Sequence, residues 1–457
     1  MSTRKSYFGT DGIRGHVNKA PMTAHVAQAL GAAIVSWMRD TQSHLPPPLI
    51  GIGTDTRRSC AMLSAALASG AASMGSDVYQ LGVLPTPAVA WWTLHTPNAL
   101  GVVISASHNP YQDNGIKLFA SNGFKLSDED ELEIEARIDQ WLAHELPLPE
   151  AEEVGQIETH GEVAVEYTQH LLSLWTQKED LSGYKIVVDA AHGAGYEIAP
   201  KLLEALGAEV ITMGVEPDGL NINKERGATH TKALQEAVLK NHASAGIALD
   251  GDADRLIAVD NIGHEVDGDQ IMAISAPYLK EQGALPNDLV VVTVMSNLGL
   301  EHCLHRHHIN LVRTQVGDRY VIKEMRETGA ALGGEQSGHL IFADHSTTGD
   351  GLLAALQLLQ IMVARKQTLS DLASYMSHYP QVLKNVMVRE KKPWDDIPGI
   401  KEAIDKAEEK MAGNGRILVR YSGTQNKARI MLEGPNEPLL HELADDIAKE
   451  FEAHLGE

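Results

Sequence analysis

Short apolar runs recur along the chain, each followed by a loop of small polar residues and then by an Ala- and Leu-rich stretch. The runs lie at residues 49–53, 185–189 and 289–294. A continuous run of β-branched residues predicts a strand buried on both faces, and the stretch after each loop predicts a helix. Three such units at wide spacing predict three related α/β domains.

The last part of the chain has a different pattern. After Tyr379 and Pro380 it holds an apolar run at 386–388, a charged helical stretch at 400–411 and a final helical stretch from Pro438. This pattern predicts a small α+β domain. The expected fold class is therefore α/β, with three similar mixed α/β domains around a central cleft and a smaller α+β C-terminal domain.

Composition predicts where the domains end. The run at 146–155 is typical of a linker, and the acidic stretch that begins at Asp128 is expected to form an exposed helix. Further breaks are expected near residues 260–263 and after Pro380. We therefore expect four domains, at residues 1–154, 155–259, 260–376 and 377–457.

The charge balance narrows the choice of partners. The formal net charge is −23, which argues against nucleic acid or an anionic membrane surface as the main partner. A phosphate site in such a chain must be built locally, from a few Arg and Lys side chains and backbone N–H groups.

The two cysteines, Cys60 and Cys303, do not predict a disulfide framework. The first residues lack the apolar core of a signal peptide, and no later run is long and apolar enough to span a bilayer. These features predict a cytoplasmic protein.

Ser107 is a candidate nucleophile. It follows the apolar run 101–104, where a strand is expected to end in the polar loop Ser-Ala-Ser-His-Asn-Pro. A hydroxyl at that position can face a cleft with His108 beside it. Ser105 is a second serine in the same loop, and an ordinary turn is the alternative interpretation.

Three aspartates follow another apolar run, at 246–249, and they form the candidate metal site. Their alternate spacing would place the carboxylates on one face of an extended backbone, and a hard divalent cation would relieve their repulsion. An EF-hand fits poorly because Arg255 and Asn261 occupy two of its required positions. A solvated acidic turn is the alternative; the three carboxylates are Asp250, Asp252 and Asp254.

Further loops carry groups suited to a phosphorylated sugar. Gly9–Gly15 places glycines around Arg14, which allows a close backbone approach to an anion, and Lys117 follows the Ser107 loop. The stretch 333–339 offers carboxylate, hydroxyl and imidazole groups for sugar hydroxyls. An exposed Gly-rich turn is the alternative for each loop. The residues proposed from the second stretch are Glu335, Ser337 and His339.

The loop after the run 416–419 is the candidate phosphate cradle. A guanidinium, two hydroxyls and a Gly N–H lie there within a few residues, and a second Arg follows. The residues proposed are Arg420, Ser422, Gly423, Thr424 and Arg429.

Two other clusters are not expected to carry function. Histidines at 302, 305, 307 and 308 surround Cys303, but side chains between a helix and a strand are usually solvated, so a metal is not expected there. Trp91 and Trp92 are expected to be packing residues.

The four ordered loops resemble those of the α-D-phosphohexomutase superfamily. The matching stretches are Tyr-Phe-Gly-Thr-Asp-Gly-Ile-Arg-Gly at 7–15 and the loops of Ser107, Asp250 and Glu335, and the similarity covers essentially the whole chain. It is strongest to the bacterial branch that acts on glucosamine phosphates. The resemblance implies interconversion of glucosamine 6-phosphate and glucosamine 1-phosphate through a bound 1,6-bisphosphate, in the supply of UDP-N-acetylglucosamine and cell-wall precursors.

The resemblance also implies a role for each loop. Ser107 would be a phosphoserine, and one Mg²⁺ would be held by a phosphoryl oxygen there and by the three aspartates. A hexosamine phosphate would be the partner, with no nucleic acid or membrane, and a homodimer stays open. The residues that would stabilise charge or move protons are Arg14, His108, Lys117 and Arg255.

The chain departs from the family pattern in two places. Tyr421, Gln425 and Asn426 stand where relatives often have Pro, Glu and Pro, and no His lies in the stretch 316–320. The general base is therefore either Asp318 or His339.

Three other functions would use some of the same loops. A phosphomannomutase/phosphoglucomutase of the same superfamily is the nearest, but Gln336 and the stretch 316–320 favour glucosamine. A phosphatase with an aspartyl nucleophile would need no Ser107. A sensor without turnover would not need both a metal loop and a nucleophile loop.

Overall fold

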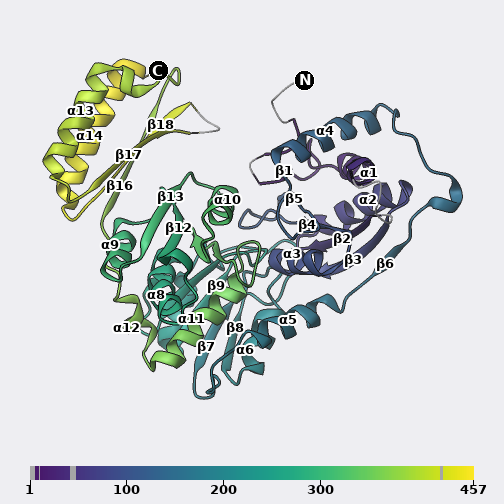
Figure 1. Cartoon of the computed structure of the whole chain (residues 1–457), viewed down its shortest axis with the longest axis horizontal. Helices are drawn as coiled ribbons and strands as arrows, with labels where there is room; N and C mark the ends of the chain where they lie inside the picture. The colour runs from purple at the N-terminus through teal and green to yellow at the C-terminus, as the bar shows by residue number, and fades with distance from the viewer. Residues whose placement is uncertain (1–5, 10, 42–47, 423–425, 457) are drawn as a thin grey trace.

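The computed structural model describes residues 6–9, 11–41, 48–422 and 426–456. It contains four sheets, and each is the centre of one domain, numbered here I to IV from the N-terminus. The domains follow one another along an arc, with domains I and IV at its two ends (Figure 1). The fold class expected from the sequence, three α/β domains and a smaller C-terminal one, is confirmed.

Domain I is built on a six-stranded sheet in the order β1-β5-β4-β2-β3-β6. Strands β2, β3, β4 and β6 are parallel; at one edge β5 runs antiparallel to β4, and β1 runs antiparallel to β5. Its elements are β1 (Ile13–His16), α1 (Ala24–Thr41), β2 (Leu49–Thr54), α2 (Ser59–Ser73), β3 (Asp77–Val83), α3 (Thr86–His95), β4 (Ala99–Ile104), β5 (Asp113–Phe119), α4 (Asp128–Leu142), η1 (Ala151–Glu153) and β6 (Ile157–Thr159).

Domain II is built on a five-stranded sheet in the order β11-β10-β9-β7-β8. Its elements are α5 (Val163–Ser173), β7 (Lys185–Asp189), α6 (Ile198–Ala205), β8 (Glu209–Met213), α7 (Lys232–Asn241), β9 (Ala245–Leu249), β10 (Leu256–Asp260) and β11 (Glu265–Val266).

Domain III has a four-stranded sheet in the order β13-β12-β14-β15. Its elements are α8 (Gly268–Glu281), η2 (Pro286–Asp288), β12 (Leu289–Thr293), α9 (Leu298–Arg306), β13 (Asn310–Thr314), α10 (Asp318–Thr328), β14 (Leu332–Gly334), β15 (Leu340–Phe342), α11 (Gly351–Arg365) and α12 (Leu369–Ala373).

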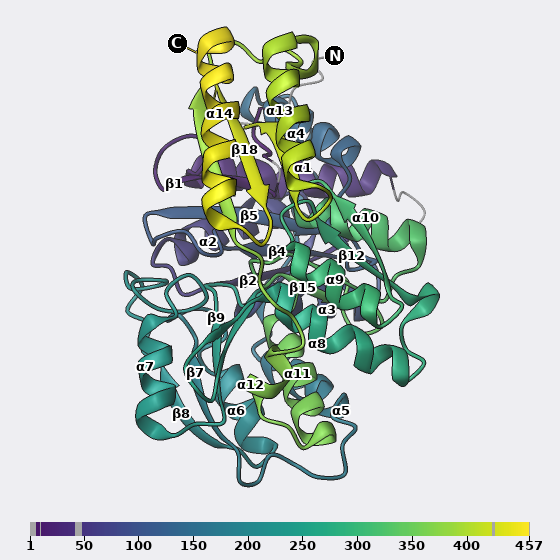
Figure 2. The ribbon, with the colours of Figure 1, turned by 90° about the vertical axis from the view of Figure 1, so that its left-hand side faces the viewer.

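Domain IV has a three-stranded antiparallel sheet in the order β16-β18-β17, with two helices beside it (Figure 2). Its elements are β16 (Gln381–Met387), η3 (Trp394–Asp396), α13 (Pro398–Met411), β17 (Arg416–Tyr421), β18 (Lys427–Glu433) and α14 (Glu437–Leu455).

One apolar cluster spans the first three domains, and domain I has a second cluster of its own. A single cluster of buried side chains includes Trp92 of domain I, Leu202 of domain II and Leu356 of domain III. The packing role expected of Trp92 is thereby confirmed. Domain IV has a core of its own, which includes Ile430 and Phe451.

Domain IV is joined to domain III through a buried carboxylate. Glu433 is fully buried, and its Oε1 accepts a hydrogen bond from the backbone N of Leu298 at 3.0 Å. Its Oε2 lies 2.8 Å from Nη2 of Arg416, and that guanidinium donates to the carbonyls of Val294 and Ser296 at 3.0 and 2.9 Å. One charge pair therefore fixes the base of domain IV on domain III.

The acidic helix α4 is less exposed than the sequence suggested. Glu135 is 6% exposed, and its carboxylate accepts hydrogen bonds from the backbone N of Ser6, Tyr7 and Phe8 at 2.7, 2.6 and 2.7 Å. A carboxylate with three N–H donors can be buried without a large penalty. The pattern of charge along α4 did not reveal this contact because its partners lie over a hundred residues away.

In each of the first three domains, one of the proposed functional loops directly follows a strand. The loops after β4, β9 and β14 carry Ser107, Asp250 and Glu335. Ligands of α/β proteins generally bind at the carboxyl ends of strands. Within the described residues, no helix is both long and apolar enough to cross a membrane.

Candidate active site

Ser107 is placed by a left-handed turn at the end of β4. Its φ is +50°, and its backbone N donates to Oγ of Ser105 at 2.9 Å, which donates to Oδ2 of Asp55 at 2.6 Å. Oγ of Ser107 lies 2.5 Å from Oδ2 of Asp250 and 3.4 Å from Nδ1 of His108. Ser105 thus connects the turn to Asp55 by hydrogen bonds, while Ser107 faces the aspartates of domain II.

The three aspartates converge, but not on an extended strand. Residues 250–253 form a tight turn with Ala253 at φ +54°, so the expectation of an extended backbone was wrong. The turn brings one carboxylate oxygen of each aspartate within 4.8 Å of the others, and all three side chains are buried. Curvature of the loop, rather than the two-residue repeat of a strand, therefore creates the cluster.

This cluster fits a divalent cation. Oδ1 of Asp252 and Oδ1 of Asp254 are buried and have no hydrogen-bond partner among the described residues. Burial, followed by the charges of Asp254 and Asp252, raises the pKa of Asp250 well above its ordinary value. Orphaned hard oxygens and crowded negative charge are what a cation with oxygen ligands would relieve. The buried triad could therefore hold a metal ion.

Two basic side chains border the aspartates. Nζ of Lys117, on β5, lies 2.9 Å from Oδ2 of Asp252 and 3.3 Å from Oδ2 of Asp254. Burial lowers the pKa of Lys117, but Asp11, Asp252 and Asp254 together hold it well above its ordinary value. Burial also lowers the pKa of Arg255, yet Asp254 and its neighbours leave it raised. Both side chains are therefore cations beside the aspartate cluster.

A pocket of about 300 Å³ opens beside Ser107 where domains I, II and III meet. It gathers seven of the residues proposed from the sequence, namely Arg14, Ser107, Asp254, Arg255, Asp318, Glu335 and His339. The residues that complete its lining are Asp11, Val316, Gly317, Arg319 and Tyr320.

The Glu335 loop forms one wall of this pocket. Oε1 of Glu335 accepts from the backbone N of Gly317 at 3.1 Å, and Oε2 accepts from Oγ of Ser337 at 3.4 Å. Gln336 points elsewhere, since its Nε2 donates to Oδ2 of Asp267 at 3.2 Å. Glu335 and Ser337 therefore supply the polar groups of this loop, and Gln336 holds the loop to Asp267.

His339 lies buried between two carboxylates. Its Nδ1 is 3.7 Å from Oδ2 of Asp254, and its Nε2 is 3.7 Å from Oδ2 of Asp318 and accepts from the N–H of Gly349 at 3.1 Å. Burial lowers the pKa of His339, but Asp254, Asp318 and Glu335 leave it above its ordinary value. Both candidates for the general base, His339 and Asp318, thus lie at the pocket.

Lys125 was missed at the sequence level. Its ammonium bridges Asp11 of domain I and Asp318 of domain III, and 12% of its side chain is exposed. Asp11 also pairs with Arg14. Lys125 follows an ordinary loop and carries no pattern that would have singled it out.

The candidate phosphate cradle of domain IV does not line this pocket with any of its described residues. Arg420 and Arg429 are paired residues on β17 and β18, and Nε of Arg429 is buried without a hydrogen-bond partner among the described residues. Burial and then the charge of Arg429 lower the pKa of Arg420. Two guanidinium groups facing each other favour an anion between them.

Tyr421 and Ser422, at the start of that loop, contact the segment at residues 391–392. The carbonyl of Ser422 accepts from Nζ of Lys391 at 2.6 Å, and the hydroxyl of Tyr421 donates to the carbonyl of Lys392 at 2.5 Å. Tyr421, which departs from the family pattern, therefore ties the loop to a basic segment. Gly423, Thr424 and Gln425 lie outside the described residues.

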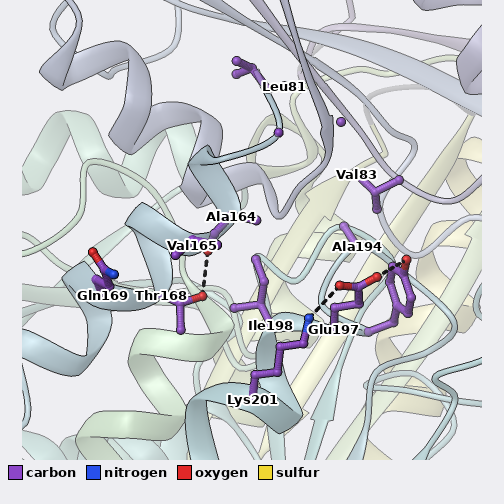
Figure 3. Close-up of a pocket in the computed structure, with 13 residues that line it drawn as sticks. Leu81, Val83, Ala164, Val165, Thr168, Gln169, Ala194, Glu197, Ile198 and Lys201 are labelled. Atoms are coloured by element: carbon purple, nitrogen blue, oxygen red, sulfur yellow. Dashed lines mark hydrogen bonds and ion pairs between the residues drawn. The ribbon is translucent and has the colours of Figure 1, made fainter. Parts of the chain in front are cut away.

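A second cavity, of about 440 Å³, lies between β3, α5 and α6 (Figure 3). Its lining is mainly apolar, with the ion pair of Lys201 and Glu197 at 2.8 Å along one side. None of the described residues proposed from the sequence for the site lines it. The chemistry is therefore concentrated at the junction of the first three domains.

Comparison with known proteins agrees with this arrangement. The chain matches four domains of the phosphoglucomutase/phosphomannomutase family: α/β/α domains I, II and III at residues 5–145, 165–263 and 267–379, and the C-terminal domain at 383–450. A phosphoglucosamine mutase of Symbiobacterium thermophilum is 51% identical over 449 residues, 98% of this chain and 99% of that protein. One of Syntrophotalea carbinolica is 49% identical over 455 residues, 99% of this chain and 98% of the relative.

Solved structures share the fold. A phosphoglucomutase/phosphomannomutase family protein of Burkholderia thailandensis superposes with a TM-score of 0.80 at 24% identity, covering 99% of this chain and 98% of the other. An N-acetylphosphoglucosamine mutase of Aspergillus fumigatus, solved with GlcNAc-6P and magnesium, gives 0.69 at 18% identity, covering 98% and 96%. By its four domains and its full-length similarity to these bacterial enzymes, the chain belongs to the phosphoglucosamine mutases of the α-D-phosphohexomutase superfamily.

Proposed function

We propose that the chain interconverts glucosamine 6-phosphate and glucosamine 1-phosphate, with Ser107 as the phosphoryl carrier and a hexosamine 1,6-bisphosphate as the bound intermediate. The observation that carries the proposal is the position of Oγ of Ser107, 2.5 Å from Asp250 and at the edge of a pocket that three domains line. The relatives at about half identity over the full length support the choice of hexosamine.

The reaction moves one phosphoryl group in each half. In the first, the phosphoryl group leaves Oγ of Ser107 for the free hydroxyl of the sugar phosphate, which gives the bisphosphate. In the second, the bisphosphate has turned over, and the phosphoryl group that the substrate brought with it passes to Oγ of Ser107. Such transfers require positioning and charge neutralisation above all.

Mg²⁺ is the cation proposed for the aspartate cluster. Asp250, Asp252 and Asp254 would hold it together with a phosphoryl oxygen on Ser107, and when bound it would supply Lewis-acid stabilisation of the transferred group.

The side chains around Ser107 take the remaining roles. Arg14, Lys117 and Arg255 neutralise charge on the transferred group, and His108 moves a proton at Oγ of Ser107. Asp318 and His339 are the two candidates for the proton on the sugar hydroxyl.

The sugar and the distal phosphate are bound by different domains. Glu335, Ser337 and His339 bind the sugar in both orientations, because carboxylate and hydroxyl groups accept hydrogen bonds from any properly placed sugar hydroxyl. The distal phosphate is bound in domain IV by Arg420, Ser422, Gly423, Thr424 and Arg429.

Three further expectations belong to the same proposal. The domain limits are kept near the expected 1–154, 155–259, 260–376 and 377–457, although β6 (Ile157–Thr159) and β11 (Glu265–Val266) extend the sheets of domains I and II beyond the first two limits. The protein works in the cytoplasm, where its product feeds synthesis of UDP-N-acetylglucosamine and cell-wall precursors. A homodimer stays open.

Mass spectrometry and a coupled assay test the proposal. The intact wild-type protein should carry one phosphoryl group, and Ser107→Ala should abolish both that group and the interconversion. Glucosamine 6-phosphate should give a higher kcat/KM than the phosphates of glucose or mannose, with Mg²⁺ and a sugar bisphosphate present. A preference for mannose or glucose phosphate would assign the chain to the phosphomannomutase/phosphoglucomutase activity. Release of free phosphate that survives Ser107→Ala would indicate a phosphatase.

A further inference from the structure

The loop that carries Ser107 is held from its own domain by a buried guanidinium. Arg57 follows β2, and its charged group is fully buried. Its Nε donates to Oδ2 of Asp55 at 2.8 Å, and its two terminal nitrogens donate to four backbone carbonyls. These carbonyls belong to Ser107, Asn109, Pro110 and Asp113, with the first two at 2.9 and 2.8 Å from Nη2.

The same loop is also held from domain II. Nδ2 of Asn223 donates to the carbonyls of Ser107 and Asn109 at 2.8 and 3.0 Å. Asn223 is 7% exposed, and its own backbone N donates to the carbonyl of Ala191 at 2.9 Å. Two carbonyls of the Ser107 loop therefore each receive a hydrogen bond from both domains.

The metal loop packs against the same point. A Cβ added at Gly251 would lie 2.5 Å from the carbonyl oxygen of Ser107 and 2.8 Å from Nδ2 of Asn223. Gly251 lies between two of the clustered aspartates. The carbonyl of Ser107, the amide of Asn223 and the aspartate loop are therefore in mutual contact.

These contacts fix a conformation that serine rarely adopts. A non-glycine residue in the left-handed region costs about 1–2 kcal/mol unless its surroundings hold it there, and φ of Ser107 is +50°. When the carbonyl of Ser107 is fixed, the direction of its side chain is fixed as well. Oγ then stays on the side of Asp250.

We propose that Asn223 and Arg57 are positioning residues, and that Asn223 sets the nucleophile of domain I in register with the aspartate loop of domain II. Arg57 holds the loop to its own sheet. Of the two residues, Asn223 is the one that connects domains I and II. Its hydrogen bonds therefore determine how accurately Oγ of Ser107 is placed relative to the phosphoryl group that it transfers. This role rests on the proposed function, because it assumes that Ser107 transfers the phosphoryl group.

Asn223→Asp is the decisive variant. It keeps the shape of the side chain but replaces the N–H donor with an oxygen that faces two carbonyl oxygens. We expect kcat to fall by about 10- to 100-fold, because misplacement of a reacting group by up to about 1 Å has such effects. KM should change less than threefold, since Asn223 does not line the substrate pocket. Asn223→Ala should lower kcat less than Asn223→Asp does, because it removes the N–H donor without placing a second oxygen against the carbonyls.

Matched controls lie next to each residue. Asn221→Ala removes an amide that donates to the carbonyl of Glu216 at the surface, and it should leave kcat unchanged. Arg58→Lys alters an exposed neighbour of Arg57 and should likewise be neutral. Arg57→Lys keeps the charge but loses the fork of donors, so it should lower kcat as Asn223→Asp does.

Two further measurements separate positioning from general stability. Amide exchange of residues 106–113 should be faster in Asn223→Asp, and phosphorylation of Ser107 by a sugar bisphosphate, followed by intact mass, should be slower. A variant that melts at a lower temperature but keeps kcat within twofold of wild type would overturn the proposal. Wild-type protein without interconversion would refute the proposed function itself, whereas an active wild type with an equally active Asn223→Asp refutes only the positioning role.

Discussion

Replacing Lys117 by Met removes the cation that lies deepest among the carboxylates of the site. The side chain is 1% exposed, and its ammonium faces Asp252 and Asp254 at 2.9 and 3.3 Å and Asp11 at 3.7 Å. Met has nearly the same length and can fill the space, so the change removes charge rather than volume.

The magnitude follows from the burial of these charges. Removing one partner of a buried ion pair destabilises a protein by about 3–5 kcal/mol, because the charge left behind has neither water nor a partner. In metal-free protein we therefore expect Lys117→Met to lower the unfolding midpoint of domains I to III by roughly 4–6 °C. A divalent cation at the aspartates supplies positive charge again, so Mg²⁺ should recover part of this loss.

Differential scanning calorimetry in EDTA and in excess Mg²⁺ measures both effects. A cation at about 100 times its Kd stabilises a folded protein by about 2.7 kcal/mol, and the variant should gain more than the wild type. Lys201→Met is the control, since that lysine is exposed and its surface pair with Glu197 contributes at most about 1 kcal/mol. Equal midpoints for wild type and Lys117→Met in EDTA would refute the reasoning, as would an equal response to Mg²⁺.

Three other changes have definite expected outcomes. Burial raises the pKa of Asp350 to about 6 from an ordinary 3.8. The folded protein therefore loses stability as the pH rises from about 4 to about 6, by about 3 kcal/mol in total, because ionised Asp350 is less favourable in the folded than in the unfolded chain. Asp350→Asn should therefore match wild type in urea unfolding at pH 4 and be the more stable at pH 8. Glu135→Ala leaves three backbone N–H groups without their acceptor, and we expect faster proteolytic cleavage near the N-terminus, timed by mass spectrometry. Gly51→Ala places a Cβ 2.1 Å from the ring of Trp92, so the melting temperature should fall as expected for about 1–3 kcal/mol.

Much of the site could be predicted from local sequence. Ser107 and the aspartates each follow an apolar strand directly, and strand ends are where α/β proteins bind ligands. The loop with Arg57 has the same arrangement after β2, so the rule that found Ser107 could have found it. The sequence did not show that this guanidinium is turned inward, toward carbonyls fifty and more residues away.

The contacts between domains could not be predicted in the same way. Asn223 and Lys125 lie in loops with no distinctive pattern, and their roles depend on which surfaces meet after folding. The aspartate cluster was predicted for a geometric reason that proved wrong, because a turn with Ala253 in the left-handed region replaces the extended strand. The carboxylates of α4 were expected to be exposed because the helix was considered without the segment that covers it.

The separate core of domain IV has a consequence for the energetics of binding. One apolar cluster spans domains I to III, and none of the described residues of domain IV belongs to it; domain IV is joined to domain III through Glu433 and its partners. We therefore expect the free chain to unfold as two cooperative units of unequal size. If the distal phosphate binds at the Arg420 loop as proposed, a bisphosphate in the pocket of Ser107 would stabilise both units at once, and part of its binding free energy would be used to hold them together. A ligand with two phosphates should thus make the whole chain melt as one unit, while a ligand with a single phosphate stabilises mainly the part that binds it.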